Sequence, residues 1–147
     1  MNNRIEDLAP DVQPIAKDLL RRLEAAGVEY AVTSTKRTTV EQAALYAQGR
    51  ETLERVNGLR VFARLHPITA RENTYTVTNC NGITKLSNHQ GGRALDLVPL
   101  DARGRPFWPR KESILWAEIA VHGEAAGFSW GGRWKVPDMP HWELPEG

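Results

Sequence analysis

The 147-residue sequence predicts an α+β fold, because segments with helical spacing of apolar residues alternate with short segments typical of strands. Hydrophobic residues make up 41% and charged residues 25%, an ordinary globular composition. The sequence contains no internal repeat, low-complexity tract or recognisable linker. We therefore expect residues 1–147 to form a single domain, large enough to bury a core.

The first predicted helix covers residues 12–26. Asp11 stands where a capping side chain belongs, and Gly27 follows where a helix ends. Its apolar stripe consists of Val12, Ile15, Ala16, Leu19, Leu23 and Ala26. Such a stripe is typical of a helix that packs on a core.

Two further helices follow from capping patterns and periodicity. Overlapping capping boxes, Thr38 with Glu41 and Thr39 with Gln42, predict a helix that runs through Tyr46 and ends near Gly49. A third helix is predicted over residues 113–126, followed by Gly127. We expect its core face to consist of Leu115, Ile119, His122 and Ala126.

Strands are predicted at 28–34, at 93–100 with an interruption at Pro99, and as a pair at 128–130 and 141–144. Between them, residues 50–79 are rich in charge and broken by Gly58 and Pro67, which predicts an irregular excursion with some helix. Pro106 and Pro109 bracket a loop.

Charge and cysteine content exclude several classes of function. The formal net charge is +1, from 19 basic and 18 acidic residues, which argues against nucleic-acid binding. The single cysteine, Cys80, permits neither an intramolecular disulfide nor a thiolate zinc cluster. Residues 1–7 lack an apolar signal region, and no window approaches 18 apolar residues. We therefore expect a cytoplasmic monomer without stable membrane association.

Two of the four histidines lie in segments rich in glycine, proline and carboxylates. Residues 87–96 read SNHQGGRALD, so His89 precedes Asp96 by seven residues with two glycines between them. The glycines allow a sharp turn that can bring both side chains together. Asp96 stands among apolar residues, where a carboxylate is costly to bury unless a cation or a metal accompanies it.

The second segment, 130–144, reads WGGRWKVPDMPHWEL and places Asp138 three residues before His141. Pro137 and Pro140 forbid a regular helix, so we expect a rigid loop that enters a strand at His141. Two imidazoles and one carboxylate are a common ligand set for catalytic zinc, which lowers the pKa of bound water and polarises a carbonyl. His89, Asp96 and His141 are thus candidate Zn²⁺ ligands, and Asp138 is the candidate general base. On spacing alone, ordinary surface or hydrogen-bonded core roles stay open for them.

A resemblance to a known family favours the zinc interpretation. The pattern Ser-x-His-x-x-Gly-x-Ala-x-Asp in residues 87–96, followed by an acidic residue three before His141, resembles the signature of M15-type zinc peptidases. These include D-Ala-D-Ala carboxypeptidases, dipeptidases and the L-alanyl-D-glutamate endopeptidases of phage endolysins. The tail at 130–144 is most similar to the endolysin-like branch, in which the base is an aspartate, as at Asp138. The resemblance implies a small Hedgehog/DD-peptidase-like fold with an antiparallel sheet carrying the metal site.

The resemblance extends to further residues. In M15 relatives an arginine after the first strand points into the active site, and Arg37 matches it, which implies electrostatic stabilisation of substrate or developing charge. Gln42, on the next helix, is a candidate for the same cleft, and Trp134 a candidate for its border. Ser87 is interpreted as a hydrogen-bonding residue around the ligands rather than a nucleophile. Glu143 stays open as an alternative base.

The expected function is hydrolysis of a peptidoglycan stem-peptide bond, most simply L-Ala–D-Glu, by an enzyme that a phage-type membrane pore releases to the wall. A D-Ala-D-Ala carboxypeptidase and a non-catalytic zinc-stabilised wall-binding module are the alternatives. The sequence departs from its relatives at residues 34–37, which read STKR in place of the common Ser-Gly-Tyr-Arg, and at Arg133, where relatives usually have an aspartate. Arg133 reverses a charge near the expected cleft and so bears on substrate preference.

Overall fold

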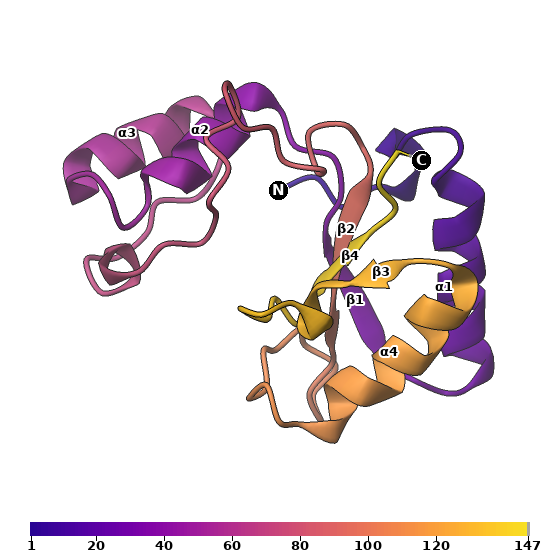
Figure 1. Ribbon diagram of the computed structural model, residues 1–147. Coiled ribbons are helices and arrows are strands. Elements are labelled where there is room, and N and C mark those ends of the chain that lie inside the picture. Colours follow the sequence, from indigo (N-terminus) through magenta and orange to yellow (C-terminus); the bar gives the residue numbers. More distant parts are fainter. Residues whose placement is uncertain (147) are drawn as a thin grey trace. The chain divides into compact units, whose positions relative to one another are not determined.

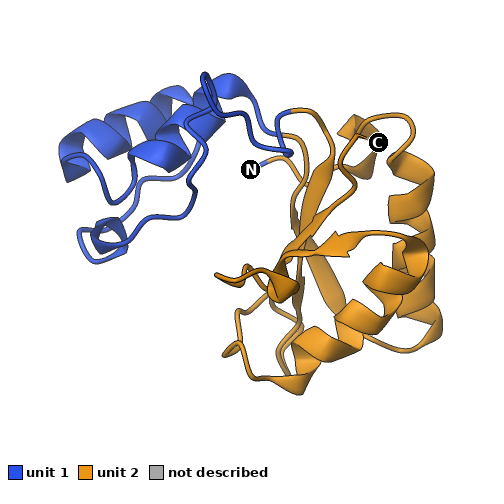
Figure 2. Cartoon of the chain, viewed as in Figure 1, with its two compact units in different colours: residues 1, 37–90 blue, residues 2–36, 91–147 orange. Residues whose placement is uncertain are grey.

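The computed structural model describes residues 1–146 and divides the chain into two compact units (Figures 1 and 2). Unit 1 comprises Met1 and residues 37–90, and unit 2 comprises residues 2–36 and 91–147. Helices and antiparallel strands are both present, as the predicted α+β class requires. Among the described residues, none of the helices has the length and apolar character needed to cross a bilayer.

Unit 2 contains a four-stranded sheet in which every pairing is antiparallel. Its strands are β1 (Tyr30–Ser34), β2 (Ala94–Pro99), β3 (Ser129–Trp130) and β4 (His141–Glu143), in the spatial order β1-β2-β4-β3. The four predicted strands therefore form, each slightly shorter than expected. The central pair, β2 and β4, places residues from the two motifs directly opposite each other, with Asp96 across from His141.

Two helices of unit 2, α1 (Gln13–Ala25) and α4 (Ile114–Ala126), lie side by side against one face of this sheet (Figure 1). A short 3-10 helix, η1 (Ile5–Asp7), precedes α1, and another, η3 (Gly131–Arg133), follows β3. The buried core consists of Leu8, Val12, Ala16, Leu19, Leu23, Leu95, Leu97, Ile119, Ala120, Phe128 and Trp142. The apolar stripe predicted for the first helix therefore contributes most of the helical side of this core.

The structure corrects the predicted cap of α1. Val12 occupies the N-cap position without a side-chain cap, and the helix begins at Gln13 with a proline in its first turn. Asp11 instead accepts a hydrogen bond from Arg93, at 2.6 Å between Oδ1 and Nη1. A charged partner from a distant segment has thus replaced the local backbone donors that a cap would use.

The structure also corrects the predicted core face of α4. Its buried residues are Trp116, Ile119, Ala120 and Gly123. Of the predicted face only Ile119 is buried, whereas Leu115, His122 and Ala126 are half-buried. The helix is apolar nearly all round, so periodicity alone could not choose the face, and packing around Trp116 and Trp142 decides it.

Unit 1 contains α2 (Thr39–Ala47), α3 (Leu53–Phe62) and the 3-10 helix η2 (Glu72–Thr74). The capping box predicted at Thr38 and Glu41 is present at the start of α2. The excursion at 50–79 does contain helix, but Gly58 lies inside α3 and does not interrupt it. A small core of Ala44, Leu45 and Leu65 joins α2 to the segment after α3.

The alternation of side chains along the strands separates the core from the candidate site. Leu95 and Leu97 of β2 point to the helices, so Asp96 between them points to the opposite face. Trp142 of β4 likewise lies in the core, which turns His141 and Glu143 to the same face as Asp96. The face of the sheet away from α1 and α4 therefore carries two of the three candidate ligands.

Trp142 is expected to stabilise this arrangement more than any exposed tryptophan. Trp142 lies between His141 and Glu143 in the sequence of β4. Its side chain is completely buried and stacks on Trp130, with 5.7 Å between ring centroids. We predict that Trp142→Ala lowers the free energy of unfolding by about 3–5 kcal/mol. Trp108→Ala, at a residue that is 62% exposed, should change it by about 0.5 kcal/mol or less. Urea denaturation of both variants measures the difference, and equal effects would contradict the packing described.

Candidate metal centre

Three side chains selected from the sequence lie together in the structure. His89, Asp96 and His141 each offer one ligand atom, and these atoms all lie within 4.8 Å of one another. His89 and His141 are buried, at 2% and 7% exposure, and Asp96 is half-buried. Two imidazoles and a carboxylate this close, and largely shielded from water, form a donor set that fits zinc.

The turn around His89 is built from its own neighbours. The backbone N–H of His89 donates to the Ser87 hydroxyl at 3.2 Å. The Ser87 N–H in turn donates to the side-chain oxygen of Gln90 at 2.9 Å, and the Gln90 N–H donates to the Ser87 carbonyl at 3.0 Å. Ser87 thus contacts the backbone of the candidate ligand, which is a positioning contact rather than the geometry of a nucleophile.

His141 is surrounded by carboxylates. Its Nδ1 lies 3.4 Å from Oδ1 of Asp96, and its Nε2 lies 2.7 Å from Oε1 of Glu143. Burial lowers the pKa of His141, but hydrogen bonds with Asp96 and Glu143 and the negative charges of Asp96 and Asp138 outweigh it and leave the pKa raised. This concentration of negative charge at a buried imidazole favours a cation, either a proton or a metal ion.

The contact from Glu143 gives that residue a role that the sequence alone left open. When a histidine binds a metal through one ring nitrogen, the other nitrogen usually donates to a carboxylate or carbonyl that fixes the ring. Glu143 contacts Nε2, and Nδ1 is the ring nitrogen on the Asp96 side. The sequence did indicate that Glu143 lies on the same face as His141, because residues two apart on a strand share a face.

The loop between η3 and β4 presents Asp138. Its N–H donates to the Gly131 carbonyl at 2.9 Å, and its own carbonyl accepts from the His141 N–H at 3.2 Å. The side chain of Asp138 is exposed, and its charge acts on His141. The Trp134 ring contacts the His141 ring, with 4.9 Å between ring centroids, and Trp134 is itself 43% exposed. A carboxylate and an indole therefore both act on the same imidazole.

Arg37 is tied to unit 1 on both its backbone and its side chain. Its N–H donates to the His89 carbonyl at 3.0 Å, and its Nη1 donates to Oε1 of Gln42 at 3.3 Å. Gln42 is completely buried, and its amide nitrogen donates to the Thr78 hydroxyl and the Cys80 carbonyl. Gln42 therefore holds Arg37 and the segment 78–80 in place through hydrogen bonds, and its own side chain is not exposed to solvent.

Arg133, the residue that departs from the common pattern, has a partner on α4. Its guanidinium makes a two-point contact with the carboxylate of Glu124, including Nη2 to Oε1 at 2.6 Å. The hydrogen bond with Arg133 lowers the pKa of Glu124, and the same contact raises the pKa of Arg133. The reversed charge expected from the sequence is therefore paired within unit 2 rather than presented alone.

Gly131 is the tightest point of this loop. A side-chain carbon there would meet the Asp138 carbonyl at 2.6 Å and Cβ of His141 at 3.0 Å, so the backbone would have to move. We predict that Gly131→Ala displaces the 131–141 segment and lowers peptidase activity at saturating zinc by about tenfold or more, because small misplacements of reacting groups are costly. Gly58→Ala is the control, since no atom lies within 4 Å of the added carbon there and the backbone of Gly58 is helical. An active Gly131→Ala enzyme would show that this close approach does not set the geometry.

Part of the chain matches a known protein family, and nearly all of it is similar to a known enzyme. Residues 81–144, which contain both motif segments, match a family model of M15 peptidases described as D-alanyl-D-alanine carboxypeptidase. The chain is 27% identical over 155 residues to the peptidoglycan L-alanyl-D-glutamate endopeptidase CwlK of Bacillus subtilis, covering 97% of this chain and 80% of that protein.

Two solved structures share the fold. One is the L-Ala D-Glu endopeptidase ChiX of Serratia marcescens, with a TM-score of 0.57 and 25% identity, covering 96% of this chain and 83% of that one. The other is a mutant of the vancomycin-resistance D,D-pentapeptidase VanY in complex with Zn(II), with a TM-score of 0.57 and 16% identity, covering 92% and 71%. The second likeness concerns the fold alone.

Proposed function

We propose that the chain is a zinc peptidase of the M15 type, which residues 81–144 match, and that it hydrolyses a peptide bond in the stem peptides of peptidoglycan, specifically the L-alanyl–D-glutamate bond. The observation that carries the catalytic part of this proposal is the cluster of His89, Asp96 and His141 with Asp138 three residues from the last ligand. We further propose that the two units together make one catalytic domain.

The proposed ligands are His89, Asp96 and His141, with Glu143 fixing the ring of His141 through Nε2. Zinc, when bound there, lowers the pKa of water and polarises the scissile carbonyl. Two of the proposed ligands are held by the backbone structure around them, His89 by the turn at Ser87 and His141 by β4. Such support holds ligands in place before the metal arrives, which raises metal affinity.

Asp138 is proposed as the general base. Its exposed carboxylate can take a proton from water and return it to the leaving amine, and its backbone is fixed by Gly131 and His141. Arg37, held by Gln42, is proposed to stabilise negative charge that develops on the carbonyl oxygen. The indole of Trp134 offers an apolar surface for substrate beside His141.

The choice of bond rests on the relatives. Both CwlK and ChiX are L-Ala–D-Glu endopeptidases, and each matches more than nine-tenths of this chain. The description of the matching family model favours a second candidate, hydrolysis of D-Ala-D-Ala. A zinc-stabilised module that binds the wall without cutting it is the third, and Asp138 and Arg37 beside the proposed ligands argue against it.

The tail at 130–144 supports a narrower proposal, that the protein is a phage endolysin stored in the cytoplasm until a membrane pore releases it. This proposal rests on the likeness of that tail to the endolysin-like branch. We also propose that the protein acts as a monomer.

A synthetic stem pentapeptide that ends in D-Ala-D-Ala separates the candidates. Incubation with the zinc-loaded protein should release free L-alanine and a fragment whose new amino terminus is D-glutamate, detected by mass spectrometry. Loss of the terminal D-alanine alone would establish the carboxypeptidase instead. Zinc binding with neither product would leave the binding module. Protein stripped of metal by a chelator is the control and should yield no product.

A further inference from the structure

We propose that residues 2–11, here called the N-terminal strap, position the strand end opposite Asp96, and that Asn2 and Asp7 are the positioning residues within it. The proposal rests on the metal centre proposed above and concerns how its carboxylate ligand is held. All residues of the strap lie in unit 2, together with β1, β2 and Asp96. Three groups of contacts carry the inference.

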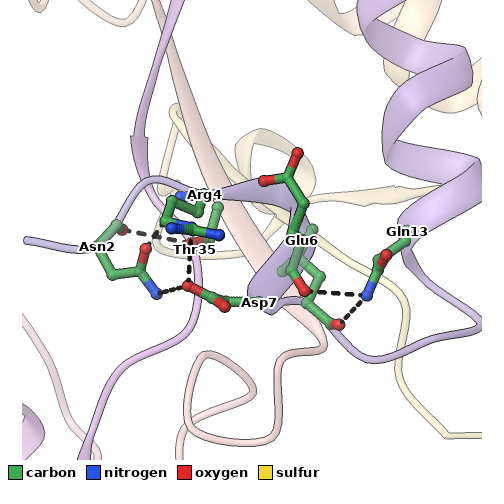
Figure 3. Close-up of polar contacts among 7 residues, drawn as sticks. Asn2, Arg4, Glu6, Asp7, Gln13 and Thr35 are labelled. Atoms are coloured by element: carbon green, nitrogen blue, oxygen red, sulfur yellow. Dashed lines mark hydrogen bonds and ion pairs between the residues drawn. The ribbon is translucent and has the colours of Figure 1, made fainter.

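The first group joins the strap to the end of β1. The backbone carbonyl of Asn2 accepts a hydrogen bond from the Thr35 N–H at 2.8 Å and another from the Thr35 hydroxyl at 3.4 Å (Figure 3). Thr35 is completely buried and comes directly after the last residue of β1. The strap therefore provides a hydrogen-bond acceptor for the first residue after β1, where the pairing of β1 with β2 ends.

The second group closes the strap on itself, so that the Asn2 carbonyl has a fixed position. The Asn2 side chain accepts from the Arg4 N–H at 3.0 Å and donates to Oδ2 of Asp7 at 3.0 Å. Arg4 also contacts Asp7 at 3.5 Å. Gln13, at the start of α1, donates to the carbonyls of Glu6 and Leu8 (Figure 3). The strap is thus a closed turn anchored to a helix.

The third group joins the strap to the segment between His89 and Asp96. The Ala9 N–H donates to the Gly92 carbonyl at 3.0 Å. Gly92 has φ of +71°, and a side-chain carbon there would meet the Ala9 nitrogen at 2.8 Å, so the pattern's glycine is required by this contact. Asp11 pairs with Arg93, whose Nε also donates to the Leu144 carbonyl.

These contacts converge on Asp96 through the register of the sheet. A bulge between Val32 and Ser34 shifts the pairing, so that Val32 lies opposite Leu97 but Ser34 lies opposite Asp96. A bulge re-aims the side chains that follow it, and such bulges gather beside active sites. Ser34 thereby faces the candidate ligand, and the next residue, Thr35, is the one that Asn2 holds.

The test uses zinc affinity, measured by competition with a chromophoric chelator in the absence of substrate. Asn2→Ala removes both side-chain bonds that fix its carbonyl, and Asp7→Ala removes one of them. We expect each to raise the zinc dissociation constant by about tenfold, the lower end of the effect of losing a residue that supports a metal ligand. Asp7→Asn keeps an acceptor for Asn2 and should stay within about twofold of the unaltered protein.

Glu6→Ala is the matched control. It removes an acidic side chain from the same turn, but the Glu6 carboxylate points away from the hydrogen bonds drawn in Figure 3. Its zinc affinity should equal that of the unaltered protein. Unchanged affinity in Asn2→Ala, or an equal loss in Glu6→Ala, would overturn the proposal. Because no substrate enters this measurement, its result is independent of whether the protein cleaves peptidoglycan.

Hydrogen exchange of the metal-free, unaltered protein gives a second test that requires no variant. The Thr35 N–H should be protected to a degree similar to the amides within β1, because Asn2 accepts from it. Asn2→Ala should accelerate its exchange at least tenfold while the amides of β2 and β4 keep their rates. Rapid exchange of Thr35 in the unaltered protein would contradict the proposed strap contact, whatever the variants show.

Discussion

Asp138→Ala is expected to abolish nearly all turnover while the protein keeps one zinc ion. A general acid–base residue typically contributes about 10²–10⁴-fold to the rate, and Asp138 is the proposed base. Its side chain is exposed, and its two backbone bonds, to Gly131 and His141, do not depend on the carboxylate. The loop should therefore persist in the variant. Turnover of the stem peptide and zinc content measured on the same sample check this expectation.

Glu143→Gln provides the comparison, because Glu143 is the other carboxylate close to His141. The amide keeps an acceptor for Nε2, so zinc affinity should fall modestly and turnover at saturating zinc should change little. The opposite pattern, an active Asp138→Ala enzyme and a zinc-loaded but inactive Glu143→Gln enzyme, would transfer the role of base to Glu143.

His89→Ala is expected to release the metal. The imidazole is buried and is one of only three proposed protein ligands, so its loss leaves an incomplete set. Zinc stoichiometry after dialysis should fall from about one to near zero, and peptidase activity should fall with it. His89→Gln fills more of the same volume and should behave alike, which separates loss of a ligand from loss of packing.

His66→Ala is the matched control, because His66 is an exposed residue outside the cluster. It should retain full zinc content and activity. Zinc binding that survives in both His89 variants would overturn the proposed ligand set, and zinc loss in His66→Ala would point to a different one.

The sequence predicts the element types of unit 2 well because its apolar patterns are regular. The stripe from Val12 to Leu23 and the alternation around Asp96 each allow a single arrangement that buries the apolar residues. The cap at Asp11 was predicted wrongly because local sequence cannot reveal a partner as distant as Arg93. The buried face of α4 was also predicted wrongly. The helix is apolar on most sides, so the spacing of its apolar residues does not indicate which side faces the core.

For the candidate site, the two motif segments indicate which residues to bring together, and strand pairing brings Asp96 opposite His141. The supporting contacts are harder to read. Glu143 on Nε2 follows from strand alternation once β4 is known, but the contact of Asn2 with Thr35 joins segments that carry no recognisable pattern. The pairing of Arg133 with Glu124 was likewise hidden, because it depends on the approach of η3 to α4.

The location of bound zinc is the most direct test of the central claim, that one metal centre built from both motif segments is the catalytic site. Anomalous diffraction at the zinc absorption edge, from crystals of the zinc-loaded protein, measures it. We predict one strong peak about 2.0–2.2 Å from ligand atoms of His89, Asp96 and His141. A peak bound by other residues, or no peak in protein that cleaves the stem peptide, would contradict the account.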